Sequence, residues 1–553
     1  MKTTKNKLAK IFYVLAFFFI ILYFPTSLWH FPDGIGYYSY LPVLFVLKNY
    51  DFMPLYKLYT HNIGVSDRGF VINDFSCGCA VLWSVAYLIS RIFESGQISI
   101  IFVNFFSSLF GIFSLYFVYK TLLLFKINNL LSKVITLFVF VGSPLLFYCY
   151  VVPQNPHTMT AFLCSAYLYF WLSTLKQKRL SRWFVLGTIL GLATLIREQE
   201  VLFVFPLVLE IFEDVFTYKK FDKFYFKAIC VFMSAFLLAL SAYFLNSLIM
   251  FGKIIVPKGY TISLKQLSFS SVFDVLFSSY HGIFWWTPIL FVGILGLFLG
   301  IKEKLVVFVS FILILFSEIF LISLVVSPAG GWSFGIRYLT DCLLIFAVGI
   351  AQVYSFLKSS KAKYVFFIIC SILCLWTVIL LILSAKNSIS LIEPYTVSEF
   401  INVVINNFGN LFRIKVLPRI VLDTEKYFFM SILFIICFCF TKLIYSAISS
   451  NTSRILLSTV LISLIIFFNF KIINAGIFNR IVYRYYKGFL SFNDYKNYYL
   501  LAGLRVRVKY YKKTGNKKKY QFYFNMLKNL KFETEKGKIL YKSFIEYLEK
   551  ELT

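Results

Sequence analysis

Long uncharged stretches recur from one end of the chain to the other, separated by short segments rich in lysine and arginine. An apolar run of about 18 residues or more is typical of a membrane-spanning helix, since about 20 residues cross a hydrocarbon core of roughly 30 Å. The strands of a transmembrane barrel would instead alternate in polarity over about 10 residues. The pattern therefore predicts an all-α polytopic membrane protein. The thirteen predicted spanning helices lie near residues 9–28, 98–121, 130–149, 157–175, 183–197, 198–214, 226–250, 283–300, 304–325, 336–355, 363–384, 426–446 and 453–472.

Composition supports this class. The chain has 553 residues, of which 59% are hydrophobic and 14% are charged, whereas soluble domains carry about 25% charged residues. Its mean hydropathy is +0.78. The net charge is +30, and many of the lysines and arginines lie in short loops between apolar runs, where they set topology and meet anionic lipid headgroups. We therefore expect membrane lipids, and no nucleic acid, as partners of this charge.

The basic segments orient the predicted helices, because lysine and arginine collect in cytoplasmic loops. If the apolar stretch 75–90 crossed the membrane, Lys120, Lys126 and Lys133 would fall outside and the alternation of basic loops would fail. We therefore predict that 75–90 is a helix on or in the outer leaflet. The segments predicted to be cytoplasmic are 120–133, 176–182, 218–227, 301–304 and 357–363.

Two parts follow from this map. Residues 1–473 form the predicted transmembrane domain, with a first external loop at 29–97 that carries two interfacial segments. Within this loop, Gly34 and Gly36 are expected to let the chain turn tightly after the first helix. Residues 474–553 form a predicted small, basic, soluble and helical C-terminal domain. Its side of the membrane stays open, because long tails follow the charge rule poorly.

Ionisable residues at membrane boundaries carry the candidate chemistry, since such residues are costly in a bilayer and mark functional sites. Those at predicted outer boundaries indicate a cavity open to the external leaflet, with one carboxylate for base catalysis, several cations for an anionic group, and aromatic walls. Asp33 is the candidate catalytic base. The candidates for binding substrate or a donor phosphate are Lys258, Arg337, Arg197, His157, His281, Glu198, Tyr37 and Tyr38.

Purely structural roles are the alternatives at most of these positions. Asp33 is the hardest to explain in this way, because a lone carboxylate at a membrane surface stabilises nothing obvious in the sequence. The structural alternatives are ion pairs of Arg197 with Glu198 or Glu200, an i,i+4 pair of Arg337 with Asp341, and an interfacial anchor at His281.

Four stretches, in the same order, resemble the GT-C glycosyltransferases, the multi-spanning enzymes that use polyprenyl-phosphate sugars. Protein O-mannosyltransferases and lipid A aminoarabinose transferases belong to that superfamily. The resemblance spans roughly residues 10–355. The stretches are "DGIGYYSYLP" (33–42), "LIREQEVLF" (195–203), "LFSSYHGIFWWTP" (276–288) and "GWSFGIRYL" (331–339).

The resemblance implies that the first external loop holds the catalytic aspartate, Asp33, beneath interfacial helices. It further implies transfer of a hexosyl or pentosyl group from an undecaprenyl-phosphate donor to a lipid, glycan or protein acceptor. The reaction would invert the anomeric carbon at the outer face of a bacterial plasma membrane. Many relatives carry a second acid where this chain has His157, which puts a paired-carboxylate mechanism in doubt. No cofactor is assigned, and dependence on a divalent metal stays open.

Two other functions fit a polytopic chain. A flippase or transporter of lipid-linked glycans is disfavoured by the long first loop and by the absence of an inverted repeat in the sequence. A glycan polymerase or ligase would gather its key residues in a large late loop, yet loop 385–425 is poor in them. A structural subunit would not need the charges at the outer boundaries.

Overall fold

The computed structural model describes most of the chain between residues 32 and 408 and a short part near the C-terminus. The predicted helices 9–28, 426–446 and 453–472 and the predicted boundary after residue 473 lie outside the described residues. The described residues are 32–47, 50, 52, 66, 68–93, 96–219, 222–254, 269–324, 333–385, 388–391, 394–408, 508, 512, 517–531, 538, 541–542 and 545–546.

Every regular element that spans several residues in this described part is a helix, as predicted. The elements up to the middle of the chain are α2 (Pro32–Pro42), η1 (Val43–Leu47), α4 (Gly78–Ser90), η2 (Arg91–Phe93), α5 (Gly96–Leu124), α6 (Asn129–Val141), α7 (Leu145–Tyr150), α8 (His157–Ser173), α9 (Leu180–Ile196), η3 (Glu198–Val204), α10 (Phe205–Tyr218), α11 (Lys223–Ala239) and α12 (Ser241–Phe251). The later elements are α13 (Phe269–Phe277), α14 (Ile283–Trp286), α15 (Pro288–Gly300), α16 (Leu305–Leu324), η5 (Arg337–Cys342), α17 (Leu343–Phe356), α18 (Ser360–Ala385), α19 (Val397–Asn407) and α24 (Lys517–Lys528).

The chain is a multi-pass membrane protein. Among the described residues, four helices are long and apolar enough to cross a bilayer, and the number rises to five if α11 and α12, bent by 46°, form one span. The four are Phe102–Leu124, Leu305–Leu324, Arg337–Phe356 and Ser360–Ser384. The count of thirteen stays a prediction.

Ten of the predicted spans fall on described residues, and each of them coincides with one helix or with two in succession. The breaks have local causes. Gly142 and Pro144 separate α6 from α7, and Pro288 begins α15 after the single turn of α14, because proline cannot continue a helix that precedes it. Such breaks let a span present side chains and backbone groups at mid-length.

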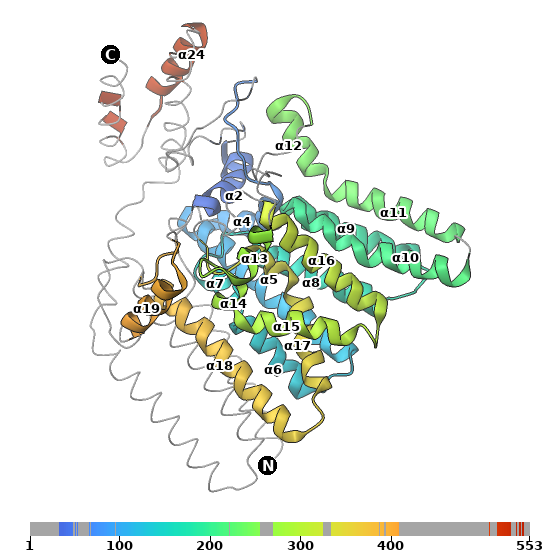
Figure 1. The fold of residues 1–553 in the computed structure, drawn as a ribbon. Coiled ribbons are helices and arrows are strands. Elements are labelled where there is room, and N and C mark those ends of the chain that lie inside the picture. The colour runs from blue at the N-terminus through green and yellow to red at the C-terminus, as the bar shows by residue number, and fades with distance from the viewer. Residues whose placement is uncertain are drawn as a thin grey trace, which may run out of the picture. The chain divides into compact units, whose positions relative to one another are not determined.

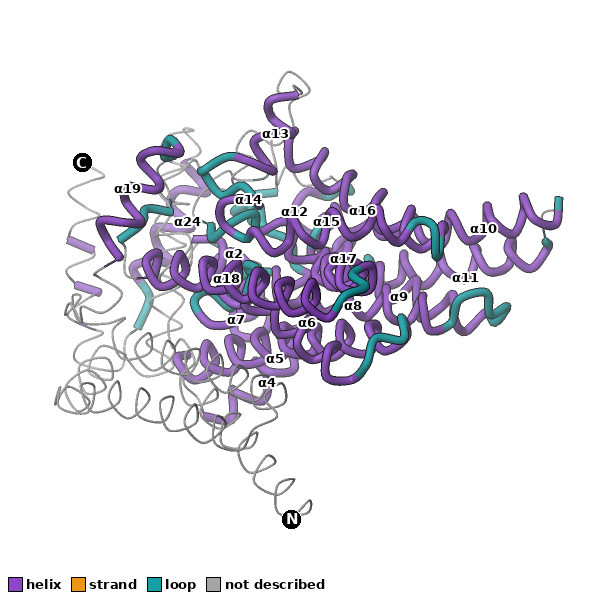
Figure 2. Tube along the Cα trace, turned by 60° about the horizontal axis from the view of Figure 1, so that its bottom comes forward, coloured by secondary structure: helices purple, strands orange, loops and turns teal. Residues whose placement is uncertain are grey.

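Helix α17 forms the centre of the bundle, with 78% of its span buried against 39–50% for the other three. It packs against α15, α5, α6 and α8, and Figure 2 shows it in the middle of these helices. Its contact with α15 is a backbone approach, since a Cβ on Gly296 would lie 1.8 Å from the carbonyl oxygen of Gly349. Small residues permit this closeness between membrane helices.

The short helices α2 and α4, in the segment predicted to be the first external loop, form a cap. Figure 1 shows α2 and α4, which pack against each other, at one end of the long helices. Helix α4 confirms the helix predicted over 75–90. It buries Trp83 and Tyr87 against the protein, while Val85 and Leu88 are 59% and 46% exposed. An apolar outer face of this kind suits contact with lipid.

Side-chain hydrogen bonds fix α2 to the loop that follows it. The amide of Asn73 donates to the Gly36 carbonyl at 3.1 Å and to Ser39 Oγ at 2.9 Å. The hydroxyl of Tyr40 donates to the Phe75 carbonyl at 2.7 Å. These bonds hold the middle and C-terminal half of α2 against residues 73–75.

The glycines beside Asp33 serve packing, which corrects the expected tight turn. Both lie inside helix α2. A Cβ on Gly36 would lie 2.0 Å from the ring of Phe75, and one on Gly34 would lie 2.6 Å from Cβ of Gln154. Neither position has room for a side chain, so close approach rather than conformational freedom requires glycine.

We predict that Gly36→Ala destabilises the protein by about 1–3 kcal/mol, the usual cost of overpacking. The melting temperature in detergent measures this effect. Adding Phe75→Leu should recover part of the loss, because it removes the ring that the new methyl group would strike. Equal melting temperatures for Gly36→Ala and wild type would contradict the packing role.

Candidate active site

The proposed base and one proposed phosphate ligand meet in an ion pair. Asp33 lies in the first turn of α2 and Arg337 begins η5. Arg337 Nη1 donates to Asp33 Oδ2 at 2.9 Å, and the two side chains are 12% and 33% exposed. The N-terminal end of a helix favours a carboxylate electrostatically. The ion pair is thus held in place, yet a ligand can reach it at Asp33, the more exposed of the two side chains.

Two arginines flank one tyrosine ring in this region. The guanidinium carbons of Arg197 and Arg337 lie 4.9 Å and 5.3 Å from the ring centroid of Tyr338. A cation over an aromatic face is stabilised by the ring quadrupole. Tyr338 therefore links the Asp33–Arg337 pair to the charged cluster around Arg197.

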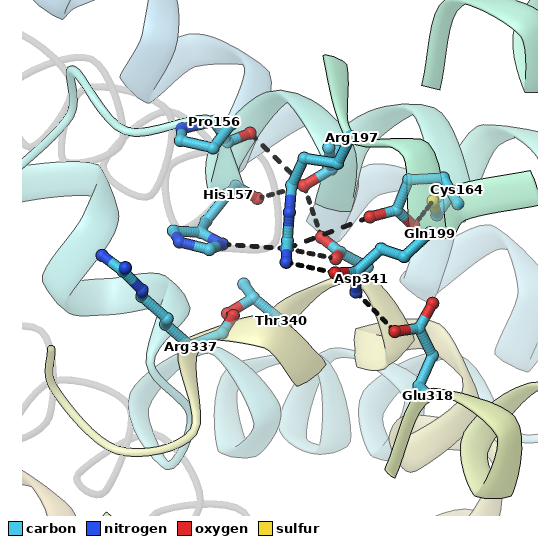
Figure 3. A network of polar contacts seen from close by, with 11 residues as sticks. Pro156, His157, Cys164, Arg197, Gln199, Glu318, Arg337, Thr340 and Asp341 are labelled. Atoms are coloured by element: carbon cyan, nitrogen blue, oxygen red, sulfur yellow. Dashed lines mark hydrogen bonds and ion pairs between the residues drawn. The ribbon is translucent and has the colours of Figure 1, made fainter. Parts of the chain in front are cut away.

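Arg197 lies at the centre of a buried polar network. It is 2% exposed and follows the last residue of α9. Its Nη1 donates to Asp341 Oδ2 at 2.9 Å and lies 3.3 Å from His157 Nδ1, while its Nη2 donates to Gln199 Oε1 at 2.6 Å. Figure 3 shows Arg197 between His157 and Asp341, with Gln199 beside them. Four elements, α8, α9, η3 and η5, are joined by this one side chain.

Two further carboxylates extend the network. Glu318, from the middle of α16, accepts a hydrogen bond from Gln199 Nε2, and Glu200 Oε2 accepts one from Cys164 Sγ at 3.1 Å. Glu200 Oε1 is 4.0 Å from Arg197 Nη1. The side chains of Glu200, Glu318 and Asp341 are fully buried, and Asp341 also accepts from Thr160 Oγ1. Glu318 is not among the site residues predicted from the sequence, although a carboxylate inside an apolar run is itself a signal of a polar site.

The two candidate histidines are buried, and residues 333–334 connect them through the contacts that follow. His157 packs on the ring of Tyr148 at 4.5 Å, and the hydroxyl of Tyr148 accepts from the Phe334 amide at 3.4 Å. The neighbouring Ser333 Oγ lies 3.1 Å from His281 Nδ1. His281 also meets the ring of Trp286 edge to face. His281 is fully buried in this structure, so it packs inside the protein.

The remaining candidates take other positions. Glu198 is exposed and does not lie on the buried face of η3. Tyr37 and Tyr38 are 7% and 1% exposed and meet Phe75 and Tyr87 edge to face. Both tyrosines therefore pack the cap against α4 and its preceding loop. Lys258 lies outside the described residues.

The structure overturns two of the structural alternatives. His281 is fully buried and is not an interfacial anchor. Arg337 and Asp341 are not paired with each other, because Arg337 pairs with Asp33 and Asp341 with Arg197. Residues 337–342 form a 3-10 helix, which has three residues per turn, so positions four apart diverge. Arg197 does form the internal ion pair that was considered, with Asp341 at 2.9 Å as its nearer partner and Glu200 at 4.0 Å.

Within the described ranges, no group of three or more histidine, cysteine, aspartate or glutamate side chains is arranged to hold a metal ion. The buried carboxylates are instead engaged with Arg197, Gln199, Thr160 and Cys164.

Residues 80–244 match the family model described as dolichyl-phosphate-mannose-protein mannosyltransferase. The matched segment begins in α4 and ends in α12, and it includes His157, Arg197 and Glu200. This match bears out, over the segment it covers, the resemblance to GT-C glycosyltransferases seen in the sequence.

Among solved structures, ArnT from Cupriavidus metallidurans in the apo state is similar over 84% of this chain and 75% of that chain, with 11% sequence identity and a TM-score of 0.43. No curated protein matches the chain.

Proposed function

We propose that this protein is a membrane glycosyltransferase of the GT-C type, which moves a sugar from a polyprenyl-phosphate donor to an acceptor at the outer face of a bacterial plasma membrane. The observation that carries the proposal is the Asp33–Arg337 pair, which unites a partly exposed carboxylate and a guanidinium at the capped end of the helices. The family match over residues 80–244 supports the reaction class.

In the proposed reaction, the acceptor hydroxyl attacks the anomeric carbon of the donor and gives its proton to Asp33. The bond between that carbon and the phosphate oxygen breaks, and polyprenyl phosphate leaves. A single displacement of this kind inverts the anomeric carbon. Arg337 would stabilise the phosphate, since a guanidinium presents two parallel donors to phosphate oxygens.

The ion pair links the roles of Asp33 and Arg337 in the proposed reaction. Arg337 binds Asp33 before the donor arrives. The donor's phosphodiester, which carries one negative charge as the carboxylate does, competes for the same guanidinium. Donor binding would then release Asp33 from Arg337 and leave it ready to accept a proton. Arg197 is a poorer phosphate ligand, because its 2% exposure and its bonds to Asp341 and Gln199 commit it to the interior.

Purified protein in nanodiscs tests the function directly when it is given a polyprenyl-phosphate sugar and candidate acceptors. Acceptor-dependent release of polyprenyl phosphate is the expected result. Movement of the lipid between leaflets without release would favour the flippase alternative and contradict the proposal.

We predict that Arg337→Ala weakens donor use by about 1.5–3 kcal/mol, the value of a hydrogen bond to a charged group, which raises KM for the donor by roughly 10- to 150-fold. Lys258→Ala should have a similar effect, and the double variant should be worse than either. Arg337→Lys is the matched control. Its KM for the donor should be intermediate, since lysine keeps the charge but not the two parallel hydrogen-bond donors of the guanidinium. Normal donor KM in the double variant would place the phosphate elsewhere.

The topology is a further prediction. Residues 29–97 should lie wholly outside, and the 13 residues of α4, which extend about 20 Å at 1.5 Å per residue, support a helix that does not cross. A cysteine introduced at Gln97 should therefore react with an impermeant reagent added from outside, with the wild-type chain as background. Reaction only from the cytoplasm would reverse the assignment of every later loop.

A further inference from the structure

A strongly basic segment near the C-terminus is not used by the proposed function. Between Asp494 and Glu533 the chain contains eleven lysines and arginines and no acidic residue. Helix α24 (Lys517–Lys528) lies within this segment. Three lysines, at 517, 518 and 519, occupy its first turn. Positive charge at a helix N-terminus opposes the helix dipole, so these lysines do not serve helix stability.

One face of α24 packs on its own small core. Leu527 and Val508 are fully buried, and the partly buried residues around them are Tyr520, Tyr523, Phe524, Leu530, Tyr541 and Ile545. The α24 members of this set recur at intervals of three and four residues, which defines one side of a helix. The small core leaves the opposite side of the helix available.

The opposite side combines charge with exposed apolar groups. Lys518, Phe522 and Met526 follow one another four residues apart and therefore form one ridge along the helix. Lys518 is exposed, and Phe522 and Met526 are 58% and 42% exposed. Phe522 thus points away from the small core, with Lys518 on one side along the ridge and Met526 on the other.

We propose that this ridge of α24 is a docking surface for an anionic lipid bilayer. A bilayer with anionic headgroups attracts the lysines and accepts Phe522 and Met526 at the boundary of its acyl chains. A soluble polyanion, such as a nucleic acid or a charged glycan, attracts the lysines alone and leaves both apolar side chains in water. Because the rest of the chain crosses a membrane, the surface is always within reach. This inference is independent of the proposed glycosyltransferase function.

Hydrogen exchange of the full-length protein in nanodiscs tests the proposal. One set of discs contains phosphatidylcholine alone, and the other adds about 30% phosphatidylglycerol to supply anionic headgroups. Amides of residues 517–531 should exchange about tenfold more slowly in the anionic discs, which corresponds to about 1.4 kcal/mol. About 0.5 M salt should remove the difference, since it shortens the range of electrostatic attraction.

Two variants separate the contributions. K517Q/K518Q/K519Q should abolish the lipid dependence while leaving α24 at least as protected in zwitterionic discs, because the unfavourable charges at its N-terminus are gone. F522S/M526S should reduce the dependence, whereas Q521S/N525S, a matched polar pair on the same helix, should leave it unchanged.

Equal exchange in both kinds of disc would overturn the proposal. Protection in zwitterionic discs on adding heparin, equal to that given by the anionic lipid and insensitive to F522S/M526S, would also overturn it and identify a polyanion as the partner. Neither readout depends on sugar transfer, so failure here and failure of the proposed enzyme activity are distinguishable.

Discussion

Asp33→Asn should lower turnover by about 10²- to 10⁴-fold, the usual contribution of a general base, without loss of folding or membrane insertion. Asparagine is nearly the same size as aspartate and can still accept a hydrogen bond from Arg337, so the contact between α2 and η5 is preserved. It cannot take a proton from the acceptor hydroxyl. A defect in turnover with an unchanged melting temperature therefore reports chemistry rather than structure.

Donor affinity gives this experiment a second, opposite signal. Without the negative charge at position 33, Arg337 loses its ionic partner in the free protein. The donor phosphate then has less to displace, so donor binding should be equal to wild type or tighter while kcat falls. Sugar transfer at the wild-type rate would show that Asp33 is not the base and would remove the strongest residue-level support for the proposed enzyme.

The Arg197–Asp341 pair should produce the largest effect on stability. Removing one partner of a buried ion pair costs about 3–5 kcal/mol, because a charge is left uncompensated. Arg197→Met should be near the upper end, since it leaves the buried carboxylates of Asp341, Glu200 and Glu318 without their cation. Asp341→Asn should cost less, because Glu200 lies 4.0 Å from Arg197 and supplies part of the lost charge.

Thermal unfolding in detergent ranks these variants, and the chain offers a matched pair as control. Arg182 and Glu210 form another buried ion pair, at 2.6 Å, with side chains 4% and 1% exposed. Arg182→Met should destabilise the protein to a similar degree. Only Arg197→Met should also change donor KM in the folded fraction, because Arg197 shares the ring of Tyr338 with Arg337. Equal stability of Arg197→Met and wild type would contradict the account of the network.

The sequence predicts elements well where a single physical signal dominates. Apolar runs predict the described helices α5, α8, α16 and α18 to within a few residues, because burial in lipid requires continuous hydrophobicity. Continuous hydrophobicity does not reveal where a helix breaks within a span. The predicted helix 198–214 is in fact the 3-10 segment η3 followed by α10, and the apolar residues continue across the break between them.

Pairings between distant residues are beyond such signals. Asp33 and Arg337 are 304 positions apart, and no periodicity connects them. Both residues can therefore be singled out from the sequence, but their contact cannot be predicted from it. The local i,i+4 pairing of Arg337 with Asp341 was the only partner that spacing could suggest, and the 3-10 geometry of η5 excludes it. The sequence suggests a turn at Gly36, because its packing partner, Phe75, becomes a neighbour only in the folded chain.

A structure of the Asp33→Asn variant with a bound polyprenyl-phosphate monosaccharide tests the central claim most directly, since slow turnover would preserve the donor. We predict a phosphate oxygen about 2.7–2.9 Å from an Arg337 nitrogen, the usual length of a charge-assisted hydrogen bond. The anomeric carbon should face the side chain at position 33, with room for an acceptor hydroxyl between them. A donor phosphate bound away from Arg337, with Arg337 still in contact with position 33, would contradict the account.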